Sequence, residues 1–107
     1  ISALKNYVEV PKYNDAISNP TFHQFIIKTK KRDQLKNYLK SFNIDTAIHY
    51  PIPIHLQNVF LKSYGRLKLP KTEKYSKRIL SLPINPHMST LEVKYVIDKV
   101  IQFFKNK

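Results

Sequence analysis

The sequence predicts a small mixed domain of the α/β class with α+β character, in which helices flank a sheet of three to four strands. Short runs of β-branched and aromatic residues alternate with segments of helical periodicity. Prolines at positions 11, 20, 51, 53, 70, 83 and 86 divide the chain into short elements. Because the chain has 107 residues, it has room for one domain with a single modest core.

The first half of the chain is predicted to contain two strands and one helix. Residues 7–10 form a short strand, residues 14–20 a loop, and the aromatic and β-branched residues 22–28 a buried strand. Apolar side chains at i, i+3, i+4 and i+7 then predict an amphipathic helix over residues 31–42: Leu35, Tyr38, Leu39 and Phe42. Asn43 suits the left-handed position that follows a helix.

The second half adds two strands and two short helices before the last helix. Residues 46–49 and 79–82 are predicted strands, and Pro83 stops the second of them. Residues 56–63 are a predicted helix that ends near the only glycine, Gly65, and residues 72–78 are another. The first of these strands leads directly into a polar loop.

The C-terminal helix is the most clearly marked element. Ser89 and Glu92 form an S-x-x-E capping box, and Met88 and Val93 supply the flanking apolar pair. An apolar stripe predicts that this helix docks on the sheet: Val93, Val96, Ile97, Val100, Ile101 and Phe104.

The loop that begins at His49 and ends at Gln57 is the strongest candidate for a functional segment. It carries two imidazoles, a phenol and a carboxamide, and Pro51 and Pro53 stiffen it because each proline holds the residue before it extended. Ligands in α/β layers tend to bind at strand ends and in the loops that follow them. An ordinary surface loop with chance histidines is the alternative.

The formal net charge of +12 raises nucleic acid as a partner. The basic residues are nevertheless mostly lysines, and the three arginines are Arg32, Arg66 and Arg78. Base and phosphate recognition favours the bidentate guanidinium. The lysines are also scattered along the chain, which favours a solvated lysine surface over a nucleic-acid footprint. A stand-alone module that binds nucleic acid or another anion remains the alternative function.

Several kinds of site are not expected in this chain. One glycine gives no phosphate-cradling loop, and the absence of cysteine excludes disulfides and thiolate metal sites. His49 and His55 lack the i, i+4 spacing of a zinc pair. The acids fall where helix caps and solvated faces place them: Asp15, Asp33, Asp45, Glu73, Glu92 and Asp98. We therefore predict no catalytic, cofactor-binding or metal-binding residue of this chain's own.

The sequence also gives expectations about where the protein is located and whether this chain is part of a larger protein. No apolar run approaches the roughly 18 residues that cross a bilayer, so no membrane partner is predicted and a soluble, cytoplasmic protein is expected. The chain begins at Ile1 and shows no leader, so we expect a fragment of a larger protein.

An ordered set of motifs over residues 13–104 resembles the C-terminal region of the DegT/DnrJ/StrS sugar aminotransferases. Its most specific part is the His-Tyr-Pro-x-Pro-x-His-x-Gln run followed by Leu-Ser-Leu-Pro. The set comprises Phe22-His23-Gln24-Phe25-Ile26-Ile27, Lys31-Arg32-Asp33-x-Leu35, Ile44-Asp45-Thr46-x-Ile48-His49-Tyr50-Pro51-x-Pro53-x-His55-x-Gln57, Pro70-x-Thr72-Glu73 and Leu80-Ser81-Leu82-Pro83-x-x-Pro86-x-Met88-Ser89.

The resemblance implies the small C-terminal domain of a fold-type I, pyridoxal-5'-phosphate-dependent aminotransferase. The full-length enzyme would be a homodimer that moves an amino group, usually from L-glutamate, to a nucleotide-linked keto sugar in cell-surface polysaccharide or amino-sugar biosynthesis. A relative that dehydrates sugars on the same scaffold is the alternative within the family. The large domain, with its Schiff-base lysine, is absent here, so this fragment alone is expected to bind no cofactor and to be inactive.

Four substrate-binding residues are carried over from the family motif: His49, Tyr50, His55 and Gln57. The first two match positions that point toward the active-site cleft, whereas His55 and Gln57 either touch ligand or support the loop. The histidine run is slightly more similar to the branch that acts on 3-keto sugars. Asn43 replaces a common glycine, and the stretch before Pro70 lacks a glycine that is common there.

Overall fold

The computed structural model describes residues 1–14 and 16–106; Asp15, within the predicted loop, lies outside the described residues. Its centre is an antiparallel sheet of β1 (Phe25–Lys28) and β2 (Ile79–Leu82), in which Ile27 pairs with Leu80. Single bridges extend the sheet on both sides, from Glu9 to Lys28 and from Ala47 to Ser81. The mixed class is confirmed, while the predicted outer strands are reduced to one bridged residue each.

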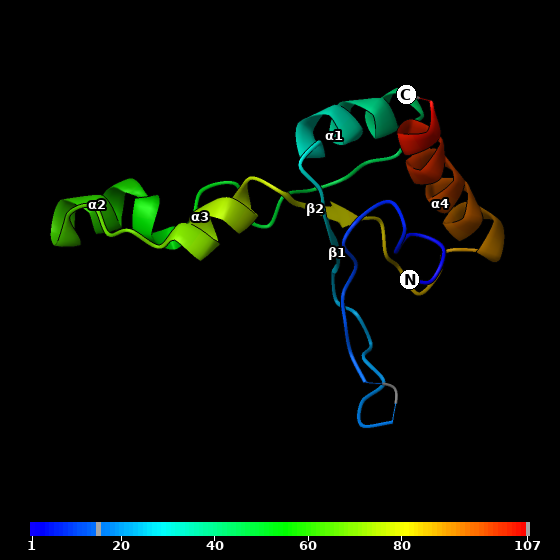
Figure 1. Ribbon diagram of the computed structural model, residues 1–107, viewed down its shortest axis with the longest axis horizontal. Coiled ribbons are helices and arrows are strands. Elements are labelled where there is room, and N and C mark those ends of the chain that lie inside the picture. The colour runs from blue at the N-terminus through cyan, green and yellow to red at the C-terminus, as the bar shows by residue number, and fades with distance from the viewer. Residues whose placement is uncertain (15, 107) are drawn as a thin grey trace.

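Two amphipathic helices pack beside the sheet and against each other, α1 (Arg32–Ser41) and α4 (Thr90–Lys105) (Figure 1). The predicted left-handed residue after α1 is confirmed, because Asn43 has φ 58°. The predicted capping box also forms at α4. Ser89 Oγ accepts the Glu92 N–H at 3.2 Å, and Glu92 Oε2 accepts the Ser89 N–H at 2.8 Å.

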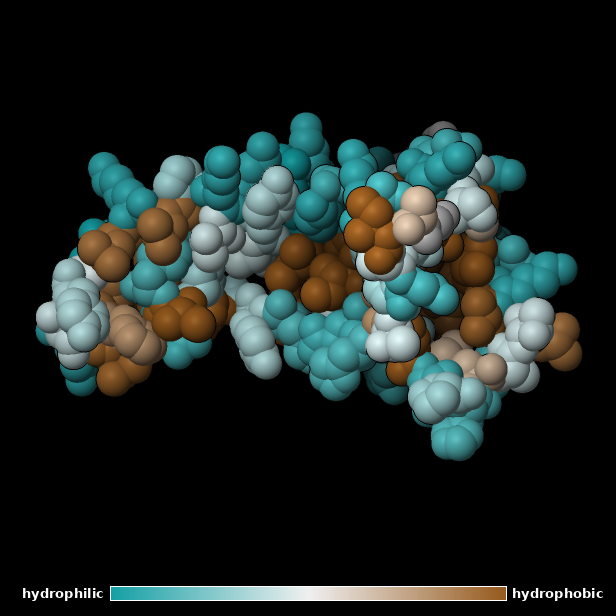
Figure 2. Space-filling model, turned by 90° about the horizontal axis from the view of Figure 1, so that it is seen from below, coloured by the Kyte–Doolittle hydropathy of each residue, from teal (hydrophilic) through white to brown (hydrophobic). Residues whose placement is uncertain are grey.

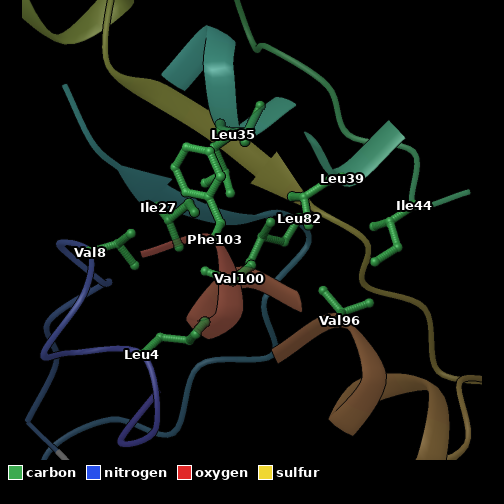
Figure 3. Close-up of a cluster of buried hydrophobic side chains, with 11 residues drawn as sticks. Leu4, Val8, Ile27, Leu35, Leu39, Ile44, Leu82, Val96, Val100 and Phe103 are labelled. Carbon is green, nitrogen blue, oxygen red and sulfur yellow. The ribbon is translucent and has the colours of Figure 1, made fainter. Parts of the chain in front are cut away.

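The core lies between the sheet, the two long helices and the N-terminal segment (Figure 3). Val96, Val100 and Phe103 are the residues that α4 buries there. The predicted stripe was therefore placed slightly off its true centre, since Val93 is 42% exposed and Phe103 belongs to the core. The core comprises Leu4, Val8, Ile27, Leu35, Leu39, Ile44, Leu80, Leu82, Val96, Val100 and Phe103.

Residues 50–78 form an arm that projects away from the sheet and the long helices (Figure 1). The arm contains a 3₁₀ turn η1 (Ile54–Leu56) and two short helices, α2 (Asn58–Tyr64) and α3 (Pro70–Ser76). The helix predicted over residues 56–63 is thus split in two. The second helix begins at Pro70, two residues before the predicted start, because proline is favourable in the first helical turn.

The arm is fastened to the body where its chain returns to the sheet. Arg32 Nη1, at the start of α1, donates to the carbonyl oxygens of Ser76 at 3.2 Å and Ile79 at 3.5 Å. Lys28 Nζ of β1 lies 4.5 Å from the ring centroid of Tyr75. We call the place where both ends of the arm meet β2 its root. The outer end of the arm, at α2, projects away from the sheet (Figure 1). In the part of the chain that the structure describes, no helix has the length and apolarity needed to span a bilayer.

Candidate functional site

The root of the arm positions His49 through β2. The Ala47 N–H donates to the Ser81 carbonyl at 3.2 Å, and the Ser81 N–H donates to the Ala47 carbonyl at 2.8 Å. His49 follows two residues later. The start of the predicted polar loop is therefore fixed by a backbone bridge to a core strand.

The ring of His49 is held by a side chain of the same strand. His49 Nδ1 and Ser81 Oγ share a hydrogen bond of 2.9 Å, and Ser81 is only 7% exposed. Within residues 1–14 and 16–106, Nε2 of His49 has no hydrogen-bond partner. One ring nitrogen is thus occupied by the protein, and the other is free for a ligand.

His49 and Ser81 line a pocket of about 290 Å³, which we call the root pocket, beside the backbone bridge between Ala47 and Ser81. Asp45, which also lines this pocket, forms a 2.6 Å ion pair with Lys40, so its charge is partly balanced. Thr46 Oγ1 is buried without a hydrogen-bond partner in the described part of the chain. The polar side chains of the pocket are His23, Gln24, Asp45, Thr46, His49 and Ser81. This lining can donate and accept several hydrogen bonds, which suits a hydroxylated ligand.

Tyr50 stands beside His49 on the outer side of the loop. The peptide bond between the two residues is cis. Their rings meet edge to face with centroids 5.7 Å apart, and Tyr50 is 70% exposed. The phenol is therefore open to a molecule outside this chain.

His55 takes a different position, inside the arm. It is 8% exposed, and its Nε2–H donates to Glu73 Oε1 at 3.1 Å, which joins η1 to α3. The same carboxylate oxygen accepts the Leu69 N–H at 3.2 Å. The hydrogen bond from His55, followed by the one from Leu69, lowers the pKa of Glu73 below its usual value. Glu73 is thus an acid at a helix start, as predicted, and also the partner of a buried imidazole.

Gln57 lies at the start of α2 with its side chain exposed. Its carbonyl oxygen accepts the N–H groups of Phe60 and Leu61, each at 3.0 Å. Of the four predicted residues, His49 and Tyr50 are neighbours at the root. His55 lines a second pocket of about 290 Å³ farther out on the arm.

Of the polar side chains in the root pocket, sequence reasoning found His49 and missed the others, among them Ser81 and His23. Ser81 is a lone hydroxyl between Leu80 and Leu82 in a buried strand, which was the available signal for a buried polar contact. His23 stands next to β1, but nothing in its sequence spacing relates it to His49. Only the pairing of β1 with β2 brings the two into one pocket.

The described residues do not fit a metal ion or pyridoxal phosphate. No three His, Cys, Asp or Glu side chains among them could hold a metal. Pyridoxal phosphate needs a sheltered lysine and a cradle for its phosphate. Every described lysine is at least partly exposed, and Gly65 lies at the end of α2 on the arm. The root pocket itself is lined by hydrogen-bonding side chains and contains no lysine.

Comparison with known proteins identifies relatives of this chain. The sequence model of the DegT/DnrJ/EryC1/StrS aminotransferase family matches residues 2–101. The pleiotropic regulatory protein of Geobacillus stearothermophilus is 38% identical over 105 residues, which cover 97% of this chain and 28% of that protein. The dTDP-3-amino-3,4,6-trideoxy-alpha-D-glucose transaminase of Streptomyces venezuelae is 37% identical over 84 residues, 78% of this chain and 22% of the transaminase.

The fold has a counterpart among solved structures. The crystal structure of a DegT/DnrJ/EryC1/StrS aminotransferase from Brucella abortus superposes with a TM-score of 0.86 at 33% identity. The match covers 96% of this chain and 28% of the aminotransferase. The chain thus spans less than a third of the length of the relatives that it matches.

Proposed function

Because this chain belongs to the DegT/DnrJ/EryC1/StrS aminotransferase family, we propose that it is the C-terminal domain of a longer pyridoxal-phosphate-dependent enzyme. That enzyme transfers an amino group from L-glutamate to a keto group of a nucleotide-linked sugar, in the synthesis of amino sugars or cell-surface polysaccharides. The reaction belongs to the longer protein, which we propose to be a homodimer. The 107 residues alone bind no cofactor and are inactive.

The observation that carries this proposal is the fixed imidazole at the arm root. His49 is held by Ser81 at 2.9 Å beside a polar pocket, and exposed Tyr50 lies next to it. A hexose presents hydroxyl and carbonyl oxygens, which imidazole and phenol groups can bind. His49 and Tyr50 therefore orient the sugar, and a positioned substrate reacts faster because less motional freedom is lost in the transition state.

His55 and Gln57 take supporting places in this proposal. His55 is buried and its Nε2–H is bound by Glu73, so it holds the loop from within the arm. Gln57 is exposed at the start of α2 and is a further contact for the nucleotide sugar. The cofactor supplies the electron sink when it is bound by the remainder of the enzyme. This chain supplies one wall of the substrate site.

For the substrate, we propose a sugar with its keto group at carbon 3. The histidine run is similar to that of the 3-keto-sugar branch, and the Streptomyces venezuelae relative is a transaminase for a 3-amino sugar. The proposal favours amino transfer over dehydration on the same scaffold and over a stand-alone anion-binding module, because relatives from Streptomyces venezuelae and Aneurinibacillus thermoaerophilus are named as sugar transaminases.

The test is a reaction of the full-length enzyme with pyridoxal phosphate, L-glutamate and a dTDP-3-keto-6-deoxy sugar. The expected products are the 3-amino sugar nucleotide and 2-oxoglutarate, in equal amounts, by mass spectrometry. A dTDP-4-keto-6-deoxy sugar serves as the matched substrate control. Turnover of the 4-keto sugar alone would overturn the assignment of carbon 3. Loss of water without amino transfer would overturn the aminotransferase proposal.

A further inference from the structure

The hydroxyl of Ser81 is placed by the sheet before any ligand arrives. Both backbone groups of Ser81 are bonded to Ala47, with distances of 2.8 and 3.2 Å. The residue sits in β2 between Leu80 and Leu82 and is 7% exposed. Because the strand is part of the core, the direction from Ser81 Oγ to the His49 ring is fixed by the fold.

The hydrogen bond between Ser81 and His49 can be drawn with either partner as donor. A serine hydroxyl has one hydrogen to donate, and a neutral imidazole has one N–H and one bare nitrogen. Within the described residues, His49 Nδ1 is the hydrogen-bond partner of Ser81 Oγ. If Nδ1 carried the proton, the hydroxyl hydrogen of Ser81, a residue only 7% exposed, would have no acceptor among the described residues. Folded proteins avoid such unpaired buried donors.

We infer that Ser81 donates to Nδ1 and thereby holds His49 in the tautomer whose Nε2 carries the hydrogen. Nε2–H then faces ligand as a hydrogen-bond donor. The group it binds must be an acceptor oxygen, either a keto or hydroxyl oxygen of the sugar or a phosphate oxygen of the nucleotide. The assignment of the ligand rests on the proposed function, whereas the tautomer rests on the Ser81 contact. Ser81 is thus a positioning residue.

The tautomer can be measured by ¹⁵N NMR of the full-length enzyme labelled in its histidine rings. At a pH of about 8.5, where an unperturbed imidazole is neutral, protonated and bare ring nitrogens differ widely in shift. The His49 signals are those missing from the His49→Gln variant. A bare Nδ1 and a protonated Nε2 are expected in the parent enzyme. A protonated Nδ1 would overturn the inference without the need for any Ser81 variant.

Variants at two buried serines separate positioning from general packing. Ser81→Ala should give a mixture of both His49 tautomers and raise KM for the keto sugar about tenfold, with the glutamate half-reaction unchanged. Ser81→Thr, which keeps the hydroxyl, should restore both. Ser76→Ala is the matched control, because Ser76 is 9% exposed and its hydroxyl donates to Glu73 O rather than to His49. An unchanged tautomer in Ser81→Ala would overturn the inference.

Ligand titration distinguishes the two sources of the acceptor oxygen. The nucleoside diphosphate alone should shift the Nε2 signal of His49 if a phosphate oxygen is bound. A shift with the complete keto sugar nucleotide only would identify the sugar. Both results support a donor role for Nε2–H. The absence of a shift with either, in an enzyme with the expected tautomer, would leave the Ser81 contact standing and overturn the proposed substrate role of His49.

Discussion

At the scale of single residues, the structure divides the polar loop into an outward-facing and an inward-facing histidine. His49 keeps one ring nitrogen free beside the root pocket, while His55 is buried and bound to Glu73. The same residue type therefore has two different roles, which the sequence spacing of the two histidines does not reveal. These two sites give separate predictions.

His49→Ala should weaken turnover of the keto sugar by about 10–100-fold, which corresponds to about 1.4–2.7 kcal/mol of lost positioning. The domain should stay folded, since His49 is partly exposed. Single-turnover kinetics of the two half-reactions provide the measurement. The glutamate half-reaction is the internal control and should lose less. Equal losses in both halves would show that His49 serves the structure rather than the sugar.

The lowered pKa of Glu73 predicts that this carboxylate makes a pH-dependent contribution to the stability of the fold. Its pKa is lowered from about 4.5, first by the hydrogen bond from His55. A lowered carboxyl pKa stabilises the fold above the unfolded value, and this stabilisation disappears as the pH falls through the folded value. Glu73→Gln should therefore melt below the parent at neutral pH, and the gap should narrow once the pH drops below about 4.5.

Thermal melts of the parent and the variant between about pH 7 and pH 3 measure this gap. A His55→Asn background supplies the control, because it removes the first cause of the lowered pKa. The gap should be smaller there and depend less on pH. A gap that is constant with pH would contradict the role of the carboxylate.

At the scale of elements, α4 is held by one buried face and one well-capped end. Val100 is fully buried, whereas Leu91 on the same helix is 79% exposed. Val100→Asp should unfold the domain, because an unpaired buried carboxylate costs several kcal/mol against a total stability of about 5–15 kcal/mol. Leu91→Asp should melt close to the parent. Circular dichroism checks both, and equal melting temperatures would mean that α4 is not docked.

At the scale of the whole molecule, the arm makes the chain elongated. The radius of gyration is 15.9 Å, against about 13 Å for a compact domain of this length. Apolar side chains gather at the outer end of the arm (Figure 2), and the exposed apolar residues of this segment include Val59 and Leu67, which are 63% and 50% exposed. The stability of this chain is therefore concentrated in the sheet and the long helices.

Hydrogen exchange of the 107-residue chain should reveal this difference. No residue of α2 is buried, whereas α4 buries Val96, Val100 and Phe103. Amides in the arm should exchange at least about tenfold faster than those of α4, because local opening there exposes little apolar surface. Mass spectrometry of peptic peptides gives both rates from one sample. Comparable protection in α2 and α4 would show that the arm is a rigid part of the core.

The sequence alone determined the features that depend on neighbouring residues. The capping box of Ser89 and Glu92, the left-handed Asn43 and the strand at residues 79–82 are set by local chemistry and were predicted correctly. The family resemblance likewise rested on an ordered set of sequence motifs and is confirmed by the match over residues 2–101.

Tertiary structure alone decided which side chains meet. The contacts of His49 with Ser81 and of His55 with Glu73 join residues 32 and 18 positions apart. Periodicity describes one element at a time, so it carries no information on such pairs. The same limit explains the outer strands, which were predicted from composition although each pairs through a single bridge. The length of a strand depends on the partner strand that the fold provides. The root pocket likewise exists only because β2 brings Ser81 next to His49 at the start of the polar loop.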